Sequence, residues 1–205
     1  HLKMRKWRRE MKKYVKTIII VSVLALMCIG YFFYLSNRKS TKDATDKSVG
    51  NQEVAALTTK DIDKNYPESP KEVVKLYARI TKAYYKTSLT DEQIEALGTN
   101  ARKLFDNELK SKQTDKEFLD ALKADIADYN SAKRYIADYT MDGSQAVKYT
   151  TIDNKEYASL VVLYSVREGS KLHKSYTRFV LRKDSDGKWK ILYWELINGN
   201  NSTQE

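Results

Sequence analysis

The longest apolar run in the chain covers residues 17–35 and contains no charged side chain. A helix of this length is ~28 Å long, which matches the hydrocarbon thickness of a bilayer. A buried helix of a globular domain would show a polar face, and this run shows none. The run ends in the bulky residues 31–35, whereas a cleaved signal peptide ends in small residues. The pattern therefore predicts an uncleaved transmembrane helix over residues 17–35.

Beyond this run, three stretches repeat apolar residues at helical spacing, and each follows a capping box. The boxes pair Ser69 with Glu72, Thr90 with Gln93, and Thr114 with Glu117. In the first stretch, one face is marked by Val73, Tyr77, Ile80 and Tyr84. In the second, the apolar face runs from Ile94 to Leu109. Three amphipathic helices need a sheet or one another to bury these faces.

The rest of the chain carries the apolar and polar patterns of strands. The predicted strands cover residues 133–141, 146–152, 156–167, 172–183 and 188–197. Short polar segments with Gly169 and Gly187 predict two hairpin turns. On one predicted strand, Lys174, Arg178 and Arg182 share a parity, which predicts a face in contact with water. Helices followed by antiparallel strands indicate a single α+β domain over residues 66–198.

Composition and charge locate this domain relative to the membrane. Residues 36–65 are rich in Ser, Thr, Lys, Asp and Asn and predict a polar linker, and residues 199–205 predict a disordered tail. The formal net charge is +10, and residues 1–16, with eight basic side chains and one acidic, hold +7 of it. Basic flanks remain cytoplasmic, so we expect a single-pass cell-membrane protein with residues 1–16 in the cytoplasm and the C-terminal domain extracellular.

The same charge distribution restricts the partners. Residues 17–205 hold 29 basic and 26 acidic side chains, a difference of only +3, which argues against a nucleic-acid partner. The predicted partner of residues 17–35 is the lipid bilayer. The single Cys28, with His1 and His173 as the only histidines, excludes an internal disulfide framework and a multi-cysteine zinc site. We therefore expect no metal and no cofactor.

The order of elements resembles a known fold. Three helices precede a sheet that ends in LRKDSDGKWKILYWEL (residues 181–196), and this layout resembles the nuclear transport factor 2-like fold. The resemblance implies that the helices pack into the concave face of a curved antiparallel sheet and form a cone with a mouth. It also implies that Tyr77, Tyr84, Asp138 and Trp194 line the cone and bind a ligand.

Two further resemblances concern the whole chain. Its basic start, single anchor and polar tether, with the motifs NYPESPKEVVKLY, LKADI and LRKDSDGKWKIL, resemble a family of uncharacterised membrane-anchored proteins of Firmicutes. Topology and fold together are also similar to the single-pass inner-membrane scaffold subunits of type IV secretion machines. The second likeness rests on architecture and not on motifs.

Three functions are compatible with these features. The first is a membrane-anchored, extracytoplasmic, non-enzymatic module that binds a small apolar ligand or a protein partner. The second is a scaffold subunit of a cell-envelope assembly of the type IV secretion kind, which would form a homodimer. The third is a SnoaL-like or ketosteroid-isomerase-like enzyme, in which Asp138 or a tyrosine of the first helix would face an open cavity. No spacing motif joins such residues, so we predict no catalytic residue and favour the first function.

Overall fold

The computed structural model describes residues 50–86, 88–141 and 146–198. The chain divides into two units, His1–Val49 and Gly50–Glu205, and all described residues belong to the second. The predicted cytoplasmic segment 1–16, transmembrane helix 17–35 and tail 199–205 lie outside the described residues. Within the part that is described, no helix is both long enough and apolar enough to cross a membrane.

The domain begins earlier than the predicted boundary at residue 66. Residues 50–58 are helical, and Val54, Leu57 and Ile62 are buried in the core. The side chain of Asn100 donates a hydrogen bond to the carbonyl of Leu57 at 2.8 Å. Over residues 50–65, the described part of the predicted linker 36–65, the structure thus differs from a polar linker, because the few apolar residues there are buried despite their polar neighbours.

Four labelled helices follow, and three of them begin where the capping boxes predicted. They are α2 (Pro70–Lys86), α3 (Asp91–Lys103), the short α4 (Asn107–Lys110) and α5 (Asp115–Ser131). Reciprocal capping boxes are present at Thr90 and at Thr114. At the start of α2, Ser69 accepts from the backbone of Glu72, whose carboxylate turns to the backbone of Glu68 instead.

The predicted second helix is interrupted after Lys103, which the apolar periodicity did not predict. Backbone hydrogen bonds of 2.8 Å join Ile191 N–H to the Leu104 carbonyl and Asp106 N–H to the Ile191 carbonyl. Residues 104–106 thus run beside a strand for a short distance. The backbone N–H and C=O groups of this segment form hydrogen bonds to a strand instead of within a helix, so they remain satisfied.

Five antiparallel strands form one sheet. They are β1 (Arg134–Met141), β2 (Lys148–Ile152), β3 (Lys155–Glu168), β4 (Lys171–Lys183) and β5 (Trp189–Ile197). The order is β1-β3-β4-β5, and β2 pairs with β3 as well. The two glycine turns are confirmed: Gly169 and Gly187 both have positive φ, which glycine adopts without a Cβ penalty. β5 lies at one edge of the sheet.

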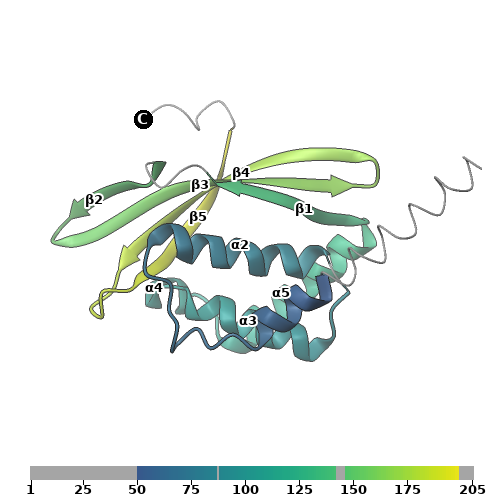
Figure 1. Ribbon diagram of the computed structural model, residues 1–205, viewed down its shortest axis with the longest axis horizontal. Helices are drawn as coiled ribbons and strands as arrows, with labels where there is room; N and C mark the ends of the chain where they lie inside the picture. The colour runs from purple at the N-terminus through teal and green to yellow at the C-terminus, as the bar shows by residue number, and fades with distance from the viewer. Residues whose placement is uncertain (1–49, 87, 142–145, 199–205) are drawn as a thin grey trace, which may run out of the picture. The chain divides into compact units, whose positions relative to one another are not determined.

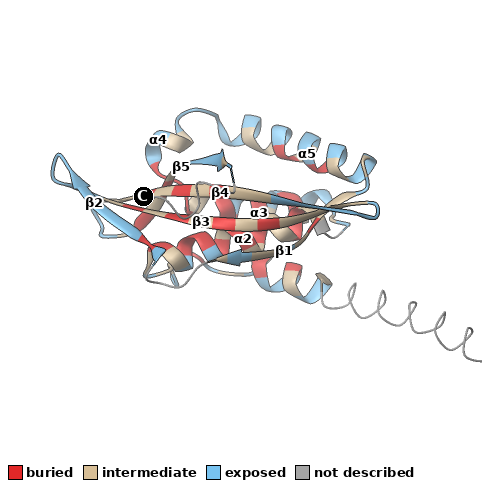
Figure 2. Cartoon of the chain, turned by 90° about the horizontal axis from the view of Figure 1, so that it is seen from above, coloured by how far each residue is buried: buried red, intermediate tan, exposed pale blue. Residues whose placement is uncertain are grey.

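The helices lie on one side of this sheet (Figure 1). Between them is a core to which α2 contributes Val73 and Ile80, and to which the sheet contributes Val162, Phe179 and Leu181. Burial is concentrated in the middle of β3 and β4 and falls toward both ends of the hairpin (Figure 2). The predicted α+β class, with helices packed on an antiparallel sheet, is confirmed.

Candidate functional site

An aromatic cluster begins in the core and ends at the surface on β5. The ring of Tyr77, on α2, lies 5.7 Å from Phe105, 5.6 Å from Phe179 and 5.5 Å from Trp194, measured between centroids. Phe105 and Phe179 are buried, whereas Trp194 is 40% exposed. Rings at these separations attract each other through offset and edge contacts. Of the predicted ligand-binding residues, the structure brings Tyr77 and Trp194 together.

Beyond Trp194, the apolar surface continues along β5. Trp194 is paired with Phe179 and Leu196 with Thr177 in the register of β4 and β5, so Trp194 and Leu196 share the face that the helices cover elsewhere. Leu196 is 76% exposed, although Thr177 beside it is buried. On the opposite face, Tyr193 is 43% exposed. We call Tyr193, Trp194 and Leu196 the β5 patch.

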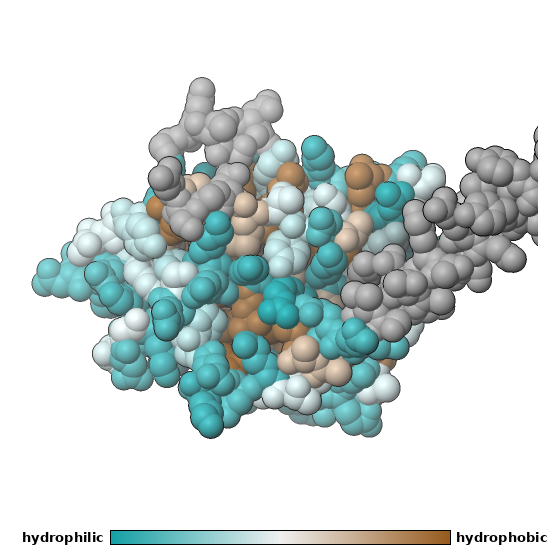
Figure 3. Space-filling model, in the orientation of Figure 1, coloured by the Kyte–Doolittle hydropathy of each residue, from teal (hydrophilic) through white to brown (hydrophobic). Residues whose placement is uncertain are grey.

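Much of the molecular surface in the view of Figure 1 is hydrophilic, with apolar residues gathered in its middle (Figure 3). The β5 patch differs from these other apolar residues because it lies on a strand at the edge of the sheet. One side of β5 pairs with β4 along its length. On the other side, among the described residues, backbone partners are found at Ile191, which bonds to residues 104–106. Residues 192–197 thus present an open edge.

Tyr84 occupies a different environment from Trp194. It is 3% exposed, and its hydroxyl has no hydrogen-bond partner within the described part of the chain. The same holds for Tyr164 on β3. Burial raises the pKa of both hydroxyls above the ordinary value for tyrosine. These two phenols are therefore buried groups that stay protonated to a higher pH than an exposed tyrosine.

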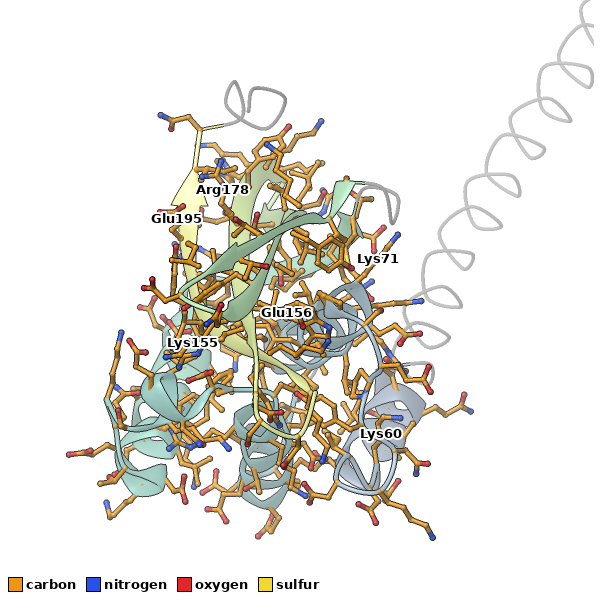
Figure 4. All side chains as sticks on the ribbon, turned by 90° about the vertical axis from the view of Figure 1, so that its left-hand side faces the viewer. Lys60, Lys71, Lys155, Glu156, Arg178 and Glu195 are labelled. Carbon is orange, nitrogen blue, oxygen red and sulfur yellow. The ribbon has the colours of Figure 1, made fainter. Side chains whose placement is uncertain are left out.

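Asp138 does not face the interior. Its side chain is 68% exposed and lies 3.0 Å from the ammonium of Lys82. Glu195 on β5 lies 3.3 Å from Arg178, on the face of β5 opposite to Trp194 (Figure 4). The structure therefore separates the predicted Asp138 from the aromatic cluster, and Glu195 also points away from Trp194.

The residue that follows Phe105, Asp106, forms an ion pair with Arg182 that the sequence did not predict. Arg182 donates two hydrogen bonds to the carboxylate of Asp106, at 2.6 and 3.1 Å, and a third to Glu108 at 3.2 Å. Asp106 also caps α4. Its side chain is 6% exposed, and that of Arg182 is 19% exposed. The prediction that Arg182 faces water is wrong, because Asp106 folds over it; a capping Asp next to Phe105 was the available signal.

A separate cavity of about 280 Å³ lies among the helices. It is lined by Thr99, Arg102, Lys103, Lys110, Asp115 and Leu119. Two of its basic side chains are paired with neighbouring elements: Arg102 contacts Asp115 at 2.6 Å, and Lys103 contacts Asp63 at 2.5 Å. These cations already join α3 to α5 and to residues before α2. In the described ranges, no group of three or more His, Cys, Asp or Glu side chains could hold a metal ion.

Comparison with known proteins places the chain in a family. The family described as a domain of unknown function (DUF6715) matches residues 4–194. The chain belongs to this family. No curated protein matches it.

Two solved structures show weak likeness. One comes from Catenulispora acidiphila, with 14% identity, a TM-score of 0.37, and coverage of 66% of this chain and 95% of the other. The second is the solution structure of the putative transfer protein TraH from the Gram-positive conjugative plasmid pIP501. It has 13% identity, a TM-score of 0.34, and coverage of 68% of this chain and 99% of TraH.

Proposed function

We propose that this protein is a membrane-anchored, extracytoplasmic, non-enzymatic binding module, whose nuclear transport factor 2-like domain recognises an apolar partner through the aromatic cluster and the β5 patch. The anchor is the predicted helix over residues 17–35, and the basic segment 1–16 supports the orientation. The described domain supplies the recognising surface. Residues 36–49 would connect it to the bilayer.

The exposed end of the aromatic cluster carries this proposal. Trp194 and Leu196 lie on the face of the sheet that is otherwise covered by helices, and both are left open to solvent. Exposed apolar area costs about 25 cal/mol per Å² relative to burial. Contiguous apolar surface that the fold could have covered is typical of a binding site.

The arrangement of ionisable groups supports binding over catalysis. An enzyme of the isomerase kind would need Asp138 or a tyrosine of α2 to face an open cavity. Asp138 is exposed and paired with Lys82, and Tyr77 is surrounded by rings. Burial raises the pKa of the Tyr77 hydroxyl above its ordinary value, which disfavours a tyrosinate base at this position.

The open edge of β5 favours a second candidate, a scaffold subunit of an envelope assembly. Scaffold subunits must bind other protein chains, and unpaired strand edges offer backbone hydrogen bonds for that purpose. Both candidates place the domain outside the cell and use the same strand. They differ in whether the partner is one ligand or a set of assembly subunits.

Side-specific labelling tests the proposal. Leu172 is exposed on β4, away from the β5 patch, so Leu172→Cys in a Cys28→Ser full chain provides one accessible thiol. We expect a membrane-impermeant maleimide to label it on intact cells, and the chain to remain with the membranes until detergent is added. Labelling only after permeabilisation, or release of the intact chain without detergent, would overturn the proposal.

A further inference from the structure

We propose that the partner of the β5 patch is a second copy of this chain, joined edge to edge through residues 193–197 in an antiparallel pair with Glu195 on the twofold axis. This inference rests on the proposed function, because it names the partner of the same surface. The two copies would form one continuous sheet, and the helices of both would lie on the same side of it.

The edge itself is suited to strand pairing. The first part of β5 is covered by residues 104–106, which bond to Ile191, and the described backbone beyond it is open on that side. Natural sheets protect open edges with proline, with unpaired charge or with covering segments. Residues 192–197 contain no proline, and their one charge, Glu195, is matched by Arg178 on the neighbouring strand. Figure 4 shows β5 at the margin of the sheet, with Glu195 and Arg178 together.

In this register, each apolar side chain of one copy lies opposite a compatible side chain of the other copy. A twofold axis normal to the sheet keeps the faces of both copies aligned, so residues of the same face oppose each other. With Glu195 on the axis, Trp194 of each copy lies opposite Leu196 of the other. On the other face, Tyr193 of each copy lies opposite Ile197. Aromatic and aliphatic cross-strand pairs stabilise a sheet by about 0.2–1 kcal/mol each.

The charges fit the same arrangement. Two Glu195 side chains would meet at the axis, which alone would disfavour pairing. Each glutamate is held 3.3 Å from an Arg178 guanidinium, so the row of charges across the dimer reads positive, negative, negative, positive. An unrelated apolar partner would not need this balance. A second copy thereby accounts for the β5 patch and for Glu195, the charged residue within the same stretch.

The predicted anchor adds to this pairing. Two strands of five residues bury less area than a standard interface of about 1,200–2,000 Å², so the contact is weak between free domains. Confinement to one membrane in one orientation raises the effective concentration of the two edges. We therefore expect the dimer in membranes and a monomer in dilute detergent.

Cysteine cross-linking at the axis tests the pairing in the full chain. Residues directly opposite in an antiparallel pair have Cα atoms about 4.5–5.5 Å apart, which a disulfide can span. In a Cys28→Ser background, we expect Glu195→Cys to form a disulfide-linked dimer when membranes are mildly oxidised. Leu172→Cys, exposed but on another strand away from the axis, should remain mainly monomeric.

A second substitution distinguishes specific strand pairing from cross-linking through random encounters between chains. Leu196→Asp added to Glu195→Cys should lower the cross-linked fraction about tenfold, because a carboxylate would face Trp194 of the other copy. Leu172→Asp added to Glu195→Cys is the matched control and should leave that fraction unchanged. Circular dichroism checks that each variant is folded.

The inference is overturned if folded Glu195→Cys does not cross-link above the level of Leu172→Cys, or if Leu196→Asp has no effect. In either case, maleimide labelling of Leu172→Cys on intact cells would still support the proposed function. Loss of that labelling, in contrast, would remove the proposed function and this inference together.

Discussion

At the scale of single residues, two arginines on β4 show how burial changes the contribution of an ion pair to stability. Arg182 and Arg178 are four residues apart on the strand, and both contact carboxylates. Arg182 meets a carboxylate that is almost fully buried, and its hydrogen bonds to Asp106 raise its pKa above the ordinary value. Arg178 and Glu195 are 33% and 48% exposed, so water reaches both groups and weakens their attraction.

We expect Arg182→Met to lower the free energy of unfolding by about 3 kcal/mol, because it leaves the Asp106 carboxylate buried without its cation. Arg178→Met, the matched control, should cost less than about 1 kcal/mol. Urea unfolding followed by tryptophan fluorescence measures both. Equal losses in the two variants would show that Asp106 does not depend on Arg182.

A second residue-scale prediction concerns the buried hydroxyl of Tyr84. Its pKa is raised by burial, so the folded chain keeps this proton at a pH where the unfolded chain has lost it. The stability is thus complete below a pH of about 10 and falls above it, by ~1.4 kcal/mol per pH unit for each such tyrosine. The sign follows because the unfolded state binds fewer protons in this range.

Tyr84→Phe should therefore weaken the decline in stability above a pH of about 10. Near neutral pH, the same substitution should change stability by less than about 1 kcal/mol, because it removes a buried hydroxyl that has no partner among the described residues. Urea unfolding at several pH values, with absorbance at the tyrosinate band, measures both effects. An unchanged alkaline slope would contradict the assignment of Tyr84 as a buried neutral group.

At the scale of elements, the segment before α2 has a larger role than its composition indicates. Leu57 is 1% exposed, and Glu53 is joined to Arg79 of α2 by an ion pair at 2.8 Å. Polar residues surround these positions in the sequence, and average hydrophobicity identifies the stretch as a linker. Burial is decided by the few side chains that turn inward, which the average does not resolve.

Leu57→Ala should lower the free energy of unfolding by about 3 kcal/mol, in the range of other large-to-small core substitutions. Leu172→Ala makes the same chemical change at an exposed position, and we expect less than about 1 kcal/mol from it. Thermal unfolding followed by circular dichroism compares the two. If Leu57→Ala lowers the free energy of unfolding as little as Leu172→Ala does, the segment before α2 is a solvated linker and not part of the core.

At the scale of the whole domain, one sheet face is only partly covered. α2 lies along the middle of the sheet, and residues 104–106 cover the first part of the β5 edge. The last residues of β5 extend beyond this cover, so Trp194 and Leu196 remain exposed. The domain therefore has a stable core and an open apolar margin, and both proposals concern that margin.

Local patterns in the sequence were sufficient for most elements. Capping boxes located α3 and α5, glycines located two hairpin turns, and alternation located the strands. These signals depend on hydrogen bonds and dihedral angles within a few neighbouring residues, so they can be recognised from a short stretch of sequence. The same locality explains why Tyr77 could be assigned to an inward face of α2.

Contacts between distant segments were decided by the tertiary structure alone. The break after Lys103 exists because residues 104–106 meet Ile191, 85 or more positions later in the chain. Arg182 is largely shielded from water because Asp106 contacts it, and Asp138 is exposed and pairs with Lys82. Periodicity shows which residues share a face, but the partner that covers that face is set by how the whole chain folds.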